Sequence, residues 1–171
     1  MTASVVDTTM PGFEIPGGLQ TPAVVVDLDI IERNIEAMAG ALSGRGVALR
    51  PHTKTHKSVE IARRQLDAGA VGLTVGTIGE AEVMVAAGFT DLFIAYPVWA
   101  GGPSGSRLRA LADAAELTIG VDSVEGARAL AGAVSGVARA PQILVEVDSG
   151  DAVAARKIFD EAFAGFQMYV P

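Results

Sequence analysis

Chemically reactive side chains are concentrated in one short segment, residues 50–57 (Arg-Pro-His-Thr-Lys-Thr-His-Lys). Both histidines of the 171-residue chain lie in it, and seven of the thirteen lysines and arginines fall between Arg33 and Arg64. Nearby positive charge disfavours the ammonium form of a lysine, and a Schiff-base lysine needs the neutral amine. The local charge would also suit a phosphate-bearing aldehyde cofactor. The residue types therefore favour carbonyl chemistry at a lysine, with a solvated basic loop ahead of a helix as the alternative.

The position of this segment narrows the choice between its two lysines. Residues 47–52 are predicted to form a short strand, and alternation along it places Arg50, His52 and Lys54 on one face. Ligands of parallel α/β folds bind at the carboxyl ends of strands. Lys57 falls beyond the strand, in the approach to the next helix. We therefore expect Lys54, not Lys57, to form the Schiff base.

The elements that must position this segment alternate regularly along the chain. A β-branched run at 23–26 predicts a strand, and Asp29, with Glu32 at capping-box spacing, predicts a helix over 29–42. Further strands are expected at 47–52, 72–75, 92–96, 117–121 and 143–147, and helices at 58–68, 77–87, 107–115, 123–134 and 151–164. Successive βα units demand a parallel sheet. The alternation fits either an open doubly-wound sheet or part of a (βα)8 barrel, and the chain is short for a closed barrel.

Composition excludes several classes of protein. The net charge is −7, which argues against nucleic acid or an anionic membrane as a partner. The chain has no cysteine, so disulfides, thiol catalysis and Cys-based metal sites are excluded. No apolar run approaches the ~20 residues that span a bilayer, and no signal peptide is evident, so we expect a cytoplasmic protein. Residues 1–20 have no periodicity and are expected to form an N-terminal arm.

The sequence from about residue 21 to residue 150 resembles a known enzyme family. The Pro-His-x-Lys-x-His-Lys element at 51–57 is similar to the start of fold-type III pyridoxal 5'-phosphate (PLP) enzymes. More narrowly, it resembles the D-threonine aldolase and D-serine dehydratase branch of the alanine racemase-like group. Shorter matches continue in order at Thr21–Ala23, Asp27–Asp29, Val75–Glu82, Ile94–Pro97, Val121–Ser123 and Val145–Gly150.

The resemblance implies a fold, a cofactor and a set of site residues. The fold would be the first, incomplete part of a TIM-type (βα)8 barrel that binds PLP, over residues 21–150. Lys54 would be the catalytic lysine that holds PLP, and the other cofactor-binding candidates are His52, Arg50, Thr77 and Tyr96. The reaction would be that of a lyase on D-β-hydroxy amino acids. The alternatives are a non-catalytic PLP-binding remnant and an amino-acid racemase.

The chain also departs from the family. Residues 151–157 do not match its pattern, and 151–171 are expected to be a divergent tail. The divalent-metal ligands of the aldolase and dehydratase belong to parts without a match here, so no metal is expected to bind and a truncated form is expected. The apolar strands have two open edges in an incomplete barrel, which predicts a homo-oligomer or an aggregation-prone chain.

Other polar segments are weaker candidates. The Gly/Ser/Pro stretch 101–106 lacks the ending of a phosphate-binding P-loop and is interpreted as a strand-to-helix loop. Asp122 and Asp148 follow predicted strands and could face a cavity. Glu146 shares a face with Asp148, but a carboxylate pair alone is weak evidence for acid–base chemistry.

Overall fold

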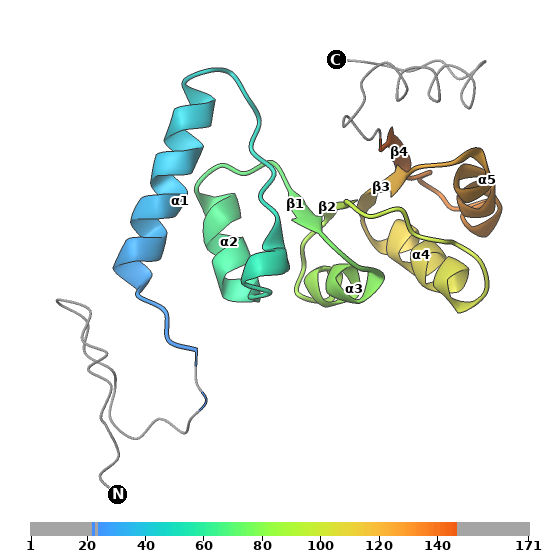
Figure 1. Ribbon diagram of the computed structural model, residues 1–171, viewed down its shortest axis with the longest axis horizontal. Coiled ribbons are helices and arrows are strands. Elements are labelled where there is room, and N and C mark those ends of the chain that lie inside the picture. The colour runs from blue at the N-terminus through green and yellow to red at the C-terminus, as the bar shows by residue number, and fades with distance from the viewer. Residues whose placement is uncertain (1–21, 23, 147–171) are drawn as a thin grey trace, which may run out of the picture.

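A four-stranded parallel sheet forms the centre of the protein. The computed structural model describes Pro22 and residues 24–146. Within them the strands follow one another in the order β1-β2-β3-β4 (Figure 1). Their bounds are Leu73–Val75, Asp91–Ile94, Glu116–Val121 and Gln142–Val145. The N-terminal arm, Asp148 and the predicted helix and tail after residue 150 lie outside the described residues.

The helices alternate with these strands and begin at recognisable caps. They are α1 (Leu28–Ser43), α2 (Val59–Asp67), α3 (Ile78–Ala86), α4 (Pro103–Ala114) and α5 (Val124–Ala133). The side chains of Ser58, Thr77 and Ser123 each accept a backbone N–H in the first turn of the following helix. Helix α4 has no such cap and instead begins with Pro103 at its first position, which suits the fixed φ of proline.

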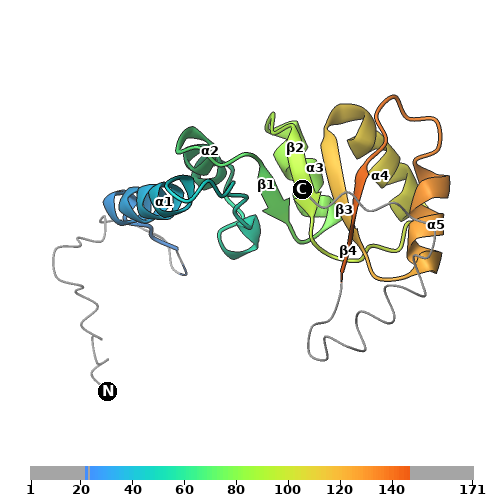
Figure 2. The same cartoon turned by 90° about the horizontal axis from the view of Figure 1, so that it is seen from above.

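The two faces of the sheet differ. Leu92 and Ile94 are fully buried, whereas Asp91 and Phe93, which point to the opposite face, are only half-buried. Helices α3, α4 and α5 pack on the face that buries the leucine and isoleucine (Figure 2). Sequential strand order with these helices on one face is the arrangement of a barrel wall, whereas a doubly-wound sheet reverses its strand order and has helices on both faces. The structure thus decides between the two architectures left open by the sequence.

Two predicted strands are not formed as expected. Val24–Val26 is exposed and forms no strand, because no partner strand lies beside it among the described residues. Segment 47–52 lies beside β1 but forms only an isolated bridge, between His52 and Thr74. Pro51 lies in the middle of this pairing and has no N–H to donate. The backbone bonds that remain are Val71 N–H to Leu49 O (2.9 Å) and Thr74 N–H to Pro51 O (2.8 Å).

Two predicted helix starts are also wrong by a few residues. Helix α1 is capped by Asp27, whose carboxylate accepts the Ile30 N–H at 3.0 Å, and not by Asp29. Helix α4 begins at Pro103 and not near Arg107. In the part of the chain that the structure describes, no helix combines the length and apolar character needed to cross a membrane. The cytoplasmic location stays a prediction.

Candidate active site

Lys54 lies on a tight turn just beyond the carboxyl end of β1. The bridge to Thr74 ends the pairing at His52, and the backbone then turns as the 3-10 helix η1 (Thr53–Thr55). The fully buried Thr53 donates its hydroxyl to the carbonyl of Thr74 at 3.3 Å and anchors the turn to the strand. Alternation therefore stops before Lys54, which is exposed and makes no salt bridge with any described residue.

His52 is oriented by the same turn. Its Nδ1 accepts the backbone N–H of Lys54 at 3.2 Å, so in the neutral imidazole the proton is on Nε2. Burial lowers the pKa of His52 below its ordinary value, and the nearby Lys54 charge lowers it further, while Glu80 acts in the opposite direction. The turn thus places an imidazole with its proton on Nε2 next to Lys54, which forms no ion pair with a described residue.

Glu80, in the first turn of α3, joins this turn to the end of β1. Its carboxylate lies 2.8 Å from Nζ of Lys57 and accepts the backbone N–H of Gly76 at 2.7 Å. The hydrogen bond from Lys57 is the main cause that lowers the pKa of Glu80, followed by the one from Gly76. A Cβ on Gly76 would lie 3.3 Å from the Glu80 carboxylate and 3.8 Å from Cε1 of His52, which places these three residues together.

The second histidine, His56, contacts the backbone at the start of α2. Nδ1 of His56 accepts the backbone N–H of Ser58 at 3.0 Å, just before α2. Burial lowers the pKa of His56, while the hydrogen bond from Ser58 acts in the opposite direction. The half-buried His56 therefore stabilises the backbone just before α2 through this hydrogen bond.

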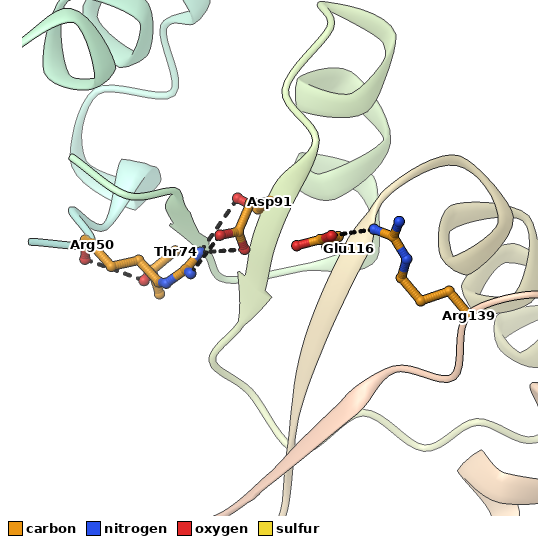
Figure 3. A network of polar contacts seen from close by, with 5 residues as sticks. All are labelled: Arg50, Thr74, Asp91, Glu116 and Arg139. Atoms are coloured by element: carbon orange, nitrogen blue, oxygen red, sulfur yellow. Dashed lines mark hydrogen bonds and ion pairs between the residues drawn. The ribbon is translucent and has the colours of Figure 1, made fainter. Parts of the chain in front are cut away.

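Arg50 lies at the other end of the sheet. Its guanidinium forms a bidentate pair with the carboxylate of Asp91, with both N–O distances at 2.8 Å (Figure 3). Asp91 is the first residue of β2, so this pair is at the amino ends of the strands, where a second pair joins Glu116 to Arg139 (Figure 3). The structure brings His52 and Lys54 together but directs the Arg50 side chain away from them. Its role in cofactor binding stays a prediction.

The remaining candidates follow the carboxyl ends of successive strands. Thr77 follows β1 and caps α3 by accepting the Glu80 N–H at 3.1 Å. Tyr96 follows β2 and is 62% exposed. Asp122 follows β3 and is also exposed. Carboxyl ends of parallel strands meet at one edge of a sheet, the edge at which such folds bind ligands. A cavity of about 200 Å³ opens there, lined by Pro97, Val98, Trp99, Gly120, Val121, Asp122, Ser123 and Gly126. Lys54 and His52 are not among its lining residues.

Sequence reasoning missed two functional contacts. Glu80 lies three residues after Thr77, a spacing that indicates only a capping box, but in the structure its carboxylate accepts the Gly76 N–H and pairs with Lys57. Sequence reasoning also missed Asp91 as the partner of Arg50. The Glu80–Lys57 and Arg50–Asp91 pairs join residues far apart in the sequence, so no local pattern signals them. Between residues 24 and 146, no cluster of three or more His, Cys, Asp or Glu side chains that could hold a metal ion is found.

Comparisons with known proteins agree with this geometry. The family model of the alanine racemase N-terminal domain matches residues 26–156. The chain is 42% identical over 132 residues to a D-threo-3-hydroxyaspartate dehydratase of Delftia sp. (strain HT23), covering 77% of this chain and 34% of that protein. It is 35% identical over 165 residues to a D-threonine aldolase of Arthrobacter sp, covering 88% of this chain and 43% of that protein.

Solved structures give the same result. A crystal structure of D-threonine aldolase from Filomicrobium marinum matches with a TM-score of 0.72 at 36% identity, over 84% of this chain and 41% of that one. A structure of D-threo-3-hydroxyaspartate dehydratase from Delftia sp. HT23 matches with a TM-score of 0.69 at 36% identity, over 85% of this chain and 41% of that one. The chain therefore spans roughly two-fifths of the length of the relatives it matches.

Proposed function

The chain belongs to the family of the alanine racemase N-terminal domain, and from this premise we propose that it carries the cofactor lysine of a PLP-dependent lyase. The substrates are D-β-hydroxy amino acids, and the reaction is of the aldolase or dehydratase type. The names of the relatives, which include D-threonine aldolase and D-threo-3-hydroxyaspartate dehydratase, support this substrate class. The observation that carries the proposal is the exposed Lys54 on a turn at the carboxyl end of β1, beside His52.

The side-chain amine of Lys54 suits PLP. An aldehyde cofactor needs a primary amine that is accessible and not held by a carboxylate, and Lys54 meets both conditions among the described residues. Lys57 is also exposed, but its Nζ is held by Glu80. When bound, PLP supplies an electron-accepting ring for the electron pair released as the Cα–Cβ or Cα–H bond of the substrate breaks.

The residues of the chain have separate roles in this proposal. Lys54 holds the aldehyde carbon of the cofactor covalently. His52 keeps its proton on Nε2, because Nδ1 accepts the Lys54 N–H, and so presents a donor to an acceptor atom of the cofactor or the substrate. Thr77 and Tyr96, at the ends of β1 and β2, are proposed as further cofactor contacts because they lie at the same edge of the sheet.

A PLP titration tests the proposal. The wild-type chain is expected to develop the long-wavelength absorption band of a PLP–lysine adduct. Lys54→Arg should abolish the band, and Lys57→Arg, which keeps a cation next to Glu80, should retain it. Absence of the band from the wild-type protein would contradict the proposal. Added in turn, D-threonine and D-serine are expected to change the band, whereas inversion of D-alanine would indicate a racemase instead.

A further inference from the structure

Two lysines three residues apart compete for any aldehyde that reaches this turn. Lys54 and Lys57 are both exposed, so accessibility alone does not distinguish them. Their surroundings differ at the side-chain nitrogen. Nζ of Lys57 lies 2.8 Å from a carboxylate oxygen of Glu80, whereas Lys54 has no carboxylate partner among the described residues.

We propose that Glu80 is a positioning residue that selects Lys54 over Lys57 as the lysine that bonds to the cofactor. The inference rests on the proposed function, since it assumes an aldehyde cofactor. It assigns to Glu80 a role beyond capping α3: its carboxylate holds the Lys57 ammonium and fixes the turn on which Lys54 is presented.

The selection follows from the chemistry of the amine. Attack on an aldehyde uses the nitrogen lone pair, forms the C–N bond and, after loss of one water molecule, leaves a C=N linkage. An ammonium group that donates to a carboxylate has no lone pair to offer. Lys57 would have to leave Glu80 and release a proton before it could react, and Lys54 is spared the first of these steps.

The Glu80 carboxylate is well placed to pair with Lys57 because a backbone hydrogen bond from Gly76 fixes its position. Its side chain is only 14% exposed, and its second oxygen accepts the Gly76 N–H at 2.7 Å. The space for this contact depends on the glycine, since a Cβ there would come within 3.3 Å of the carboxylate. The carboxylate therefore has a fixed position at the end of β1, and Lys57 reaches it from the turn.

The backbone at Lys57 points to the same role. Its φ is +49°, a left-handed conformation that costs a non-glycine residue free energy and that is held by surrounding contacts. One contact is its backbone N–H, which donates to Thr53 O at 2.7 Å, and the other is the ion pair with Glu80. Together they close the turn that contains Lys54.

Reductive trapping of PLP followed by peptide mapping measures the selection directly. Borohydride delivers a hydride to the carbon of the C=N linkage and leaves a stable secondary amine on the labelled lysine. In the wild-type protein the label is expected on Lys54. In Glu80→Gln, the ratio of Lys57 label to Lys54 label should rise about two- to fivefold, the change expected from loss of one partly exposed ion pair.

Glu82→Gln is the matched control. Glu82 lies on the same helix and is also ion-paired, but its partner is Arg107 of α4 and not a lysine of the turn. Its loss should leave the label ratio unchanged. The pKa of His52, measured by NMR without PLP, gives a second readout: Glu80 raises it, so Glu80→Gln should lower it while Glu82→Gln should not.

The outcomes separate the inference from the proposed function. No label on Lys54 of the wild-type protein contradicts the proposed function. Label on Lys54 with the same ratio in the wild-type and Glu80→Gln proteins overturns the inference alone. If Glu80→Gln does not fold, the wild-type ratio is measured at rising ionic strength, which weakens exposed ion pairs. It should then rise with salt, and a constant ratio overturns the inference.

Discussion

Replacement of Gly72 by alanine should destabilise the protein through a steric conflict that the structure locates. Gly72 is buried just before β1, and the guanidinium of Arg50 passes across it to reach Asp91. A Cβ at this position would lie 2.8 Å from Cζ of Arg50 and 2.8 Å from the backbone carbonyl oxygen of Asp91. The carbonyl belongs to the neighbouring strand and cannot rotate away, so β1 and β2 must move apart, and the Arg50 guanidinium must shift as well.

The expected cost combines three effects. Overpacking of this kind costs about 1–3 kcal/mol. Displacement of the half-exposed Arg50–Asp91 pair adds up to about 1 kcal/mol. Restriction of the unfolded chain by alanine offsets about 0.4–1 kcal/mol, because Gly72 has no positive φ that alanine would strain. The net loss of unfolding free energy is therefore about 1–3 kcal/mol.

Urea unfolding followed by far-UV circular dichroism measures this loss at one fixed protein concentration. With an m-value of about 2 kcal/mol/M, a loss of about 2 kcal/mol lowers the midpoint by about 1 M. Gly132→Ala in α5 is the control, since nothing lies within 4 Å of its Cβ, and it should gain about 0.5–1 kcal/mol. Equal midpoints for wild-type and Gly72→Ala proteins would refute the reasoning. In an Arg50→Met background the cost should shrink, because one of the two conflicting groups is gone.

Four further expectations concern the pH dependence of stability, the His52–Lys54 coupling, turnover and association. The folded protein holds the pKa of His52 below 6.5, chiefly through burial, so its contribution to stability is present above pH 6.5 and is lost as the pH falls through the folded pKa. Lys54→Met should raise the pKa of His52 in an NMR titration, and an unchanged value would rule out the electrostatic coupling. The isolated 171-residue chain should show little turnover of D-threonine or D-serine with added Mn²⁺, Mg²⁺ or Zn²⁺, and robust metal-dependent turnover in a coupled assay would contradict this. Light scattering after size exclusion should show association and not a lasting compact monomer, because β4 is the edge of the sheet among the described residues and its Ile143 and Leu144 are 41% and 51% exposed there.

The βα alternation could be predicted from the sequence because the strands are short apolar runs, and a capping residue follows β1 and β3. Thr77 and Ser123, the first residues of two predicted helix ranges, cap α3 and α5, and such N-capping is a local interaction. The strand expected at 23–26 depended on a partner strand, which propensity does not report. The order of strands and the placement of the helices on one face are likewise tertiary facts, so the choice between a barrel wall and a doubly-wound sheet required the structure.

The candidate site was predictable only in part. The closeness of Lys54 and His52 follows from the sequence, because both are in one short segment. Their place beside the carboxyl end of β1 does not, because the strand expected at 47–52 forms only a single bridge. The direction of the Arg50 side chain does not, because it depends on Asp91, forty-one positions further on, and on the space left by Gly72. The ion pair between Glu80 and Lys57 does not follow from the sequence either, because it depends on how the turn packs against β1.

The central claim is that Lys54 carries the cofactor, and reductive trapping on the wild-type chain tests it most directly. PLP is added, the adduct is reduced with borohydride, and the pyridoxyl group is located by peptide mass spectrometry. The account predicts the label on Lys54. A label on Lys57 with Lys54 unmodified would contradict it.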